Sequence, residues 1–126
     1  MPSSKYKIMV IDDEPIVGKR LKLAFEKSGY EVLVYNNGKE ALLALDKEPF
    51  DVIVTDLKMD IDGFEIFNKA KKLNPKAKVI IITGYADAQS ARRAIQEGVF
   101  DFIPKPFRLE DLKKSVLKAI EELKSK

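Results

Sequence analysis

Two kinds of hydrophobic pattern alternate along this chain, and together they predict alternating strands and helices. Short runs rich in branched apolar side chains are typical of buried β-strands, and five of them occur, over residues 7–11, 31–35, 52–55, 79–82 and 99–103. After each run, apolar residues recur three or four positions apart, which is the spacing of a helix with one buried face. This spacing predicts five helices, over residues 16–27, around 41–45, and over 63–73, about 87–97 and about 110–123.

Strands that alternate with helices of this length form βαβ units, so we expect an α/β fold with a parallel sheet between two layers of helices. The run 31–35 alternates, with Val32 and Val34 on one face, and this pattern favours a strand at an edge of the sheet. With that strand at the edge, the strand order 2-1-3-4-5 fits, which is the flavodoxin-like three-layer sandwich with five helices. The last helix is expected to face the core through Leu112, Val116, Leu117, Ile120 and Leu123.

Length and composition indicate a single domain. The chain has 126 residues, 45% of them hydrophobic, and we expect one domain over residues 1–126 with a structured core over about 7–123. The net charge of +3 is too balanced to indicate nucleic-acid binding. The sequence contains no cysteine, no membrane-spanning apolar run and no signal-peptide pattern, so we expect a cytoplasmic protein that does not bind membranes. It also contains no histidine, which excludes imidazole catalysis and a phosphohistidine within the chain.

Polar side chains follow four of the predicted strands directly. Asp12 and Asp13 follow the first strand, Asp56 the third, Thr83 the fourth, and Lys105 comes just after the fifth. In the order 2-1-3-4-5 these four strands are consecutive neighbours, and the carboxyl ends of parallel strands form the ligand crevice of an open sheet. We therefore expect the five side chains to lie close together.

The chemistry of this set points to a phosphoryl group and a metal ion. Three crowded carboxylates repel one another and need a cation, and oxygen ligands of this kind suit Mg²⁺ rather than zinc. A carboxylate can also attack phosphorus and form an aspartyl phosphate. A lysine ammonium and a threonine hydroxyl would stabilise the charge of the phosphoryl group. Each residue alone has an ordinary interpretation, such as a helix cap or a solvated loop lysine, so it is their joint occurrence that indicates a site.

Four segments on these strand ends carry a resemblance to a known family. They are Val-Ile-Asp-Asp-Glu at 10–14, Val-Thr-Asp-Leu-Lys-Met at 54–59 with Asp-Gly at 62–63, Ile-Ile-Thr-Gly-Tyr at 81–85, and Phe-Ile-Pro-Lys-Pro-Phe at 102–107. In this order and on these elements, the segments resemble the receiver domain of two-component response regulators. The resemblance covers the chain from about residue 7 to the last helix.

The resemblance implies a role for each residue of the site. Asp56 would be the phosphoacceptor, and Lys105 would pair with the phosphoryl group. The peptide bond between Lys105 and Pro106 would be cis. The Mg²⁺ ligands would be Asp12, Asp13, Asp56 and the backbone carbonyl of Lys58.

The resemblance also implies a switch. Thr83 would be the switch hydroxyl and Phe102 the switch aromatic, while Lys58 and Tyr85 occupy the two positions that tune the phosphoryl lifetime. Asp60 is a departure, because many receivers have proline there. We expect Asp60 to leave the turn less rigid and to add negative charge near the metal.

A receiver of this kind accepts its phosphoryl group from outside the chain. The donor would be the phosphohistidine of a sensor histidine kinase or of a histidine phosphotransfer protein docked on the helix 16–27, or a small acyl phosphate. The surface formed by 87–97, 99–103 and 110–123 would then signal to an output domain or effector protein, and a homodimer through this surface is a further expectation. The protein would not be an enzyme beyond its own phosphoryl transfer and slow autodephosphorylation. Whether the receiver stands alone or an output domain belongs to it stays open.

Three other interpretations of the acidic residues explain the sequence less well than a receiver does. A Mg²⁺-dependent phosphohydrolase with an aspartyl nucleophile needs its nucleophile and acid two residues apart, whereas Asp12 and Asp13 are adjacent. An interaction module that no longer takes phosphate is a second alternative, and the complete set of site residues argues against it. A calcium loop around Asp60 is excluded, because Lys58 and Lys69 would fall at its first and twelfth ligand positions.

Overall fold

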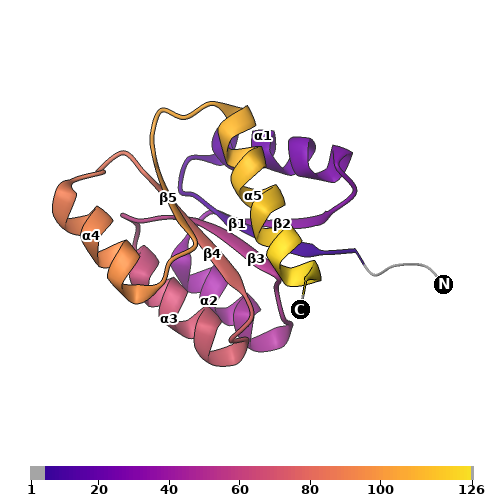
Figure 1. The fold of residues 1–126 in the computed structure, drawn as a ribbon, viewed down its shortest axis with the longest axis horizontal. Coiled ribbons are helices and arrows are strands. Elements are labelled where there is room, and N and C mark those ends of the chain that lie inside the picture. The colour runs from indigo at the N-terminus through magenta and orange to yellow at the C-terminus, as the bar shows by residue number, and fades with distance from the viewer. Residues whose placement is uncertain (1–4, 126) are drawn as a thin grey trace.

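The computed structural model describes residues 5–125, which form five strands and five helices in strict alternation (Figure 1). The strands are β1 Lys7–Ile11, β2 Glu31–Tyr35, β3 Val52–Asp56, β4 Lys78–Thr83 and β5 Asp101–Pro104. The helices are α1 Pro15–Lys27, α2 Gly38–Lys47, α3 Gly63–Leu73, α4 Ala88–Glu97 and α5 Leu109–Lys124.

The five strands form one parallel sheet in the order β2-β1-β3-β4-β5, so the predicted flavodoxin-like arrangement is confirmed. The register aligns the strand ends that matter for function. Ile11 lies beside Thr55, Asp56 lies beside Ile82, and Thr83 lies beside Pro104. The side chains at these strand ends, and those just after them, therefore emerge at one edge of the sheet.

The sheet lies between two layers of helices, α1 and α5 on one face and α2, α3 and α4 on the other (Figure 1). Successive residues of a strand point to opposite faces. Accordingly, Val10 belongs to the core cluster that contains Phe25 of α1, whereas Ile11 belongs to the cluster that contains Phe67 of α3. All of β3 is buried, as its unbroken apolar run predicts.

Side-chain caps fix the starts of three helices that border the site. The side chain of Asn37 accepts from the backbone N–H of Glu40 at 2.8 Å and begins α2. Asp62 and Asp87 do the same for α3 and α4, each at 2.7 Å. The loops before α3 and α4, which carry Lys58 and Tyr85, are thereby held at one end.

Two expectations about the ends and faces of elements are wrong in detail. The fifth strand begins at Asp101 rather than at residue 99, because the N–H of Val99 still donates to Ala94 and closes the last turn of α4. Leu117 does not face the core and is 48% exposed. It follows the buried Val116 directly, and one residue along a helix is a rotation of about 100°, which carries Leu117 off the buried face.

No helix within residues 5–125 is both long and apolar enough to cross a membrane.

Candidate phosphoryl and metal site

Three carboxylates meet at the carboxyl edge of the sheet, as the strand order predicts. Asp12 follows β1 and is fully buried, Asp13 is exposed, and Asp56 is the last residue of β3 and only 6% exposed. Each can contribute one carboxylate oxygen to a group whose members all lie within 4.8 Å of one another.

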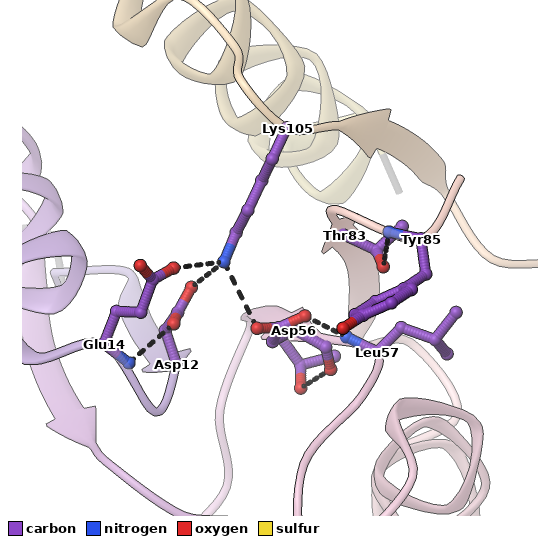
Figure 2. Close-up of polar contacts among 8 residues, drawn as sticks. Asp12, Glu14, Asp56, Leu57, Thr83, Tyr85 and Lys105 are labelled. Atoms are coloured by element: carbon purple, nitrogen blue, oxygen red, sulfur yellow. Dashed lines mark hydrogen bonds and ion pairs between the residues drawn. The ribbon is translucent and has the colours of Figure 1, made fainter.

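Lys105 brings the only ammonium in this cluster of described residues. Its backbone N–H donates to the carbonyl of Thr83 at 2.7 Å, which fixes the start of its side chain beside β4. The ammonium lies 2.9 Å from Oδ2 of Asp12, 3.2 Å from Oδ2 of Asp56 and 3.0 Å from Oε1 of Glu14 (Figure 2). Lys105 therefore reaches the phosphoacceptor candidate from across the sheet edge.

Glu14 is a member of this cluster that sequence reasoning missed. An acid directly before a helix is usually no more than a favourable charge at the helix start, so the position of Glu14 alone does not indicate a site. Its backbone N–H donates to Oδ1 of Asp12 at 2.9 Å, and its carboxylate meets Lys105, 91 residues further along the chain. The predicted cis peptide bond between Lys105 and Pro106 is confirmed.

Burial and ion pairing set the charges of the site. Burial raises the pKa of Asp12, and the N–H of Glu14 and the Lys105 ammonium offset this only in part. Burial alone would lower the pKa of Lys105, but its hydrogen bonds to Asp12 and Glu14 outweigh that effect and raise the pKa well above the usual range. Lys105 is therefore a permanent cation in contact with three carboxylates, those of Asp12, Glu14 and Asp56.

The donor set fits a hard divalent cation. Among the described residues, Oδ2 of Asp12 is a buried side-chain oxygen without a hydrogen-bond donor in good geometry, and its charged neighbour is the Lys105 ammonium. Asp13 and Asp56 add further oxygens, and an excess of negative charge remains after Lys105 is counted. Oxygen ligands with partial access to water are the surroundings that Mg²⁺ prefers.

The turn after Asp56 is closed by a glycine. The N–H of Gly63 donates to the carbonyl of Leu57 at 2.9 Å, and the N–H of Leu57 donates to Oδ1 of Asp56 at 2.7 Å. A Cβ on Gly63 would lie 2.7 Å from the carbonyl oxygen of Asp56 and 3.0 Å from the Cα of Leu57. Only glycine allows the start of α3 to pack this closely on the backbone of the acceptor.

This contact yields a prediction on stability. Gly63→Ala should lower the free energy of unfolding by about 2 kcal/mol, because the new methyl group meets backbone atoms that cannot rotate away. Gly84→Ala is the matched control, since a Cβ there would meet nothing within 4 Å, and its effect should stay within about 0.5 kcal/mol. Urea denaturation measures both, and equal stabilities of the two variants would contradict the close packing at Gly63.

Asp60 does not loosen the turn as expected. Its carboxylate accepts from the N–H of Gly38 at 2.7 Å and from the N–H of Lys39 at 3.2 Å, so side-chain hydrogen bonds anchor the turn to α2. Accepting from Gly38 lowers the pKa of Asp60, which keeps the side chain charged.

The two lifetime-tuning candidates lie next to each other. The ammonium of Lys58 is 5.9 Å from the ring centroid of Tyr85, and both side chains are exposed at the rim of the site.

The two switch candidates lie on the side of the site away from Asp12. Thr83 is fully buried at the end of β4, and its hydroxyl accepts from the N–H of Tyr85 at 2.9 Å (Figure 2). Phe102 is half-buried and packs against a small core cluster that contains Leu57, the residue directly after Asp56, and Ala94 of α4. A continuous set of contacts therefore runs from the acceptor to α4.

Comparisons with known proteins agree with this geometry. The family model of the response regulator receiver domain matches residues 8–117. The transcriptional regulatory protein GlrR of Escherichia coli is 34% identical over 116 residues, which cover 91% of this chain and 26% of that protein. This chain thus spans about a quarter of the length of such curated relatives.

Solved structures of receiver domains superpose closely. One from Clostridium thermocellum is 36% identical, with a TM-score of 0.86 over 94% of this chain and 97% of that one. A response regulator from Burkholderia pseudomallei, solved with a phosphorylated aspartic acid, a calcium ion and citrate, is 27% identical, with a TM-score of 0.82 over 96% of this chain and 72% of that one. The chain belongs to the response regulator receiver domain family.

Proposed function

We propose that this receiver accepts a phosphoryl group on Asp56 in a Mg²⁺-dependent reaction. The observation that carries the proposal is the convergence of three carboxylates with the Lys105 ammonium, which contacts Asp56 directly. The related structure from Burkholderia pseudomallei, whose description includes a phosphorylated aspartic acid, supports it. The donor would be a phosphohistidine of a sensor histidine kinase or histidine phosphotransfer protein, or a small acyl phosphate, since this chain has no histidine.

In the proposed reaction, an oxygen of Asp56 forms a bond to phosphorus. The bond between phosphorus and the donor atom breaks, and its electron pair leaves with the donor. Asp12, Asp13, Asp56 and the backbone carbonyl of Lys58 would hold Mg²⁺, which when bound neutralises charge on the phosphoryl oxygens. Lys105 already contacts three carboxylates of the site, and it would exchange one of these contacts for a phosphoryl oxygen.

The switch would begin at Thr83. The new negative charge on Asp56 attracts the Thr83 hydroxyl, whose oxygen is now held by the N–H of Tyr85. Movement of Thr83 frees space beside β5, into which the half-buried Phe102 can turn. Phenylalanine has no hydroxyl group, so packing alone distinguishes its two positions. The coupling cannot exceed the difference between the free energies by which phosphorylation stabilises the two positions, and such differences are typically about 1–3 kcal/mol.

Two surfaces would serve partners. On α1, Ile16 is 67% exposed, and a pocket of about 340 Å³ between α1 and the loop after β5 includes Arg20, Lys105 and Phe107. A kinase or phosphotransfer protein docked there would border the site. The α4-β5-α5 surface, where Ile95 is 79% exposed, would carry the signal to an output domain or effector and would support a homodimer. We place this signalling role in the cytoplasm, with no catalysis by the receiver beyond self-phosphorylation and slow autodephosphorylation.

Beryllofluoride, which mimics a phosphoryl group on a carboxylate, tests the switch. With Mg²⁺ present, it should change backbone amide shifts both in the metal loops and across residues 91–107, because the change at Thr83 is passed to β5 and α4. The measurement is a two-dimensional NMR titration, with Mg²⁺ alone as the control. Shifts confined to the metal loops in a protein that binds the analogue would show that the α4-β5-α5 surface is the wrong choice.

A further inference from the structure

The loop between β3 and α3 is tied to the start of α2 by one side chain. Asp60, near the middle of this loop, accepts from the N–H of Gly38 at 2.7 Å and from the N–H of Lys39 at 3.2 Å. These are the first two residues of α2, where backbone N–H groups have no partner within the helix. The contact therefore joins two segments that are more than twenty residues apart, on neighbouring elements.

A close backbone approach accompanies these hydrogen bonds. A Cβ on Gly38 would lie 2.5 Å from the Cβ of Ile61 and 3.3 Å from Oδ1 of Asp60, so the loop rests directly on the helix start. At its base, the loop is closed by the hydrogen bond from Gly63 to the carbonyl of Leu57. The segment is thus fixed at its base and at its middle, and Lys58 lies between these two points.

We propose that Asp60 is a positioning residue, which holds the backbone from Asp56 to Lys58 in place for Mg²⁺ by anchoring this loop to α2. The inference rests on the proposed function, because it takes the Lys58 carbonyl and Asp56 as metal ligands. This role goes beyond capping α2, because the same side chain also holds the loop that carries the metal ligands. Asn37 also caps α2, by accepting from Glu40 at 2.8 Å, yet it holds nothing in the loop.

Mg²⁺ affinity, measured by isothermal titration calorimetry, distinguishes three possible effects of Asp60. These are anchoring of the loop to α2, capping of α2, and the negative charge of the carboxylate. Asp60→Ala should weaken Mg²⁺ binding about tenfold, the effect typical of removing a partner that orients metal ligands. Asn37→Ala, which removes a cap from the same helix, should bind Mg²⁺ as the wild type does even if its melting temperature falls. Asp60→Asn loses the negative charge but keeps an oxygen for Gly38, so its affinity should stay within about twofold of the wild type.

Gly38→Ala tests the same contact from the other side. It keeps the Asp60 carboxylate but drives the loop from the helix, so it should weaken Mg²⁺ binding as Asp60→Ala does. If Asp60→Ala does not fold, the comparison of Asp60→Asn with Gly38→Ala decides the question.

Several outcomes would overturn the inference. Wild-type affinity in both Asp60→Ala and Gly38→Ala would exclude anchoring, and equal losses in Asp60→Asn and Asp60→Ala would assign the effect to charge. If the wild type itself does not bind Mg²⁺, the proposed function fails, and this inference fails with it.

Discussion

Replacing Asp56 with asparagine is expected to abolish incorporation of a phosphoryl group from acetyl phosphate. The amide keeps the size of the side chain but removes the charged oxygen that would attack phosphorus. The structure gives Asp56 surroundings that suit an acceptor, since it is nearly buried, lies at the end of the central strand and contacts Lys105 at 3.2 Å. The mass of the intact protein after incubation with acetyl phosphate and Mg²⁺ measures the effect.

Asp62→Asn is the matched control for this prediction. It removes an acid from the same loop, and asparagine can still cap α3 as Asp62 does through the N–H of Phe64. This control should take up the phosphoryl group as the wild type does. Wild-type uptake by Asp56→Asn would show that another residue is the acceptor.

Asp13→Ala is expected to remove the stabilisation that Mg²⁺ gives the folded protein. A ligand that binds only the folded state at about one hundred times its dissociation constant stabilises that state by about 2.7 kcal/mol. Asp13 is the exposed member of the carboxylate cluster, so its removal takes away one ligand without opening the core. The melting temperature with and without Mg²⁺ measures the difference.

Asp46→Ala is the control for this second experiment. Asp46 is an exposed acid on α2 that pairs with Lys69 rather than with the site, so Mg²⁺ should raise the melting temperature of this variant as it does for the wild type. An undiminished Mg²⁺ effect in Asp13→Ala would place the metal elsewhere.

The residues of the site could be predicted from the sequence because strand ends in a parallel sheet obey a simple rule. The hydrophobic runs predict where each strand begins and ends, and the alternating run predicts which strand lies at the edge of the sheet. Because the strands are parallel, their carboxyl ends all lie at one edge of the sheet. This rule predicts that Asp12, Asp56, Thr83 and Lys105 lie together. In the structure Lys105 contacts Asp12 and Asp56, and its backbone N–H donates to the carbonyl of Thr83.

Contacts that depend on loop geometry could not be predicted in this way. Glu14 meets Lys105, and Asp60 meets Gly38, only because the loops fold back onto neighbouring elements. No periodicity records such a contact, and a carboxylate in a loop is usually solvated. Leu117 shows a different limit, because an apolar residue one step off the buried face of a helix fits the same pattern as a core residue.

The most direct test of the central claim is to locate the phosphoryl group in the wild-type chain. After incubation with acetyl phosphate and Mg²⁺, borohydride reduction of the acyl phosphate and peptide mapping by mass spectrometry identify the modified residue. We expect a single modified position, Asp56. Modification at Asp12 or Asp13 instead, or no modification in a protein shown to bind Mg²⁺, would contradict the assignment of Asp56 as the phosphoacceptor.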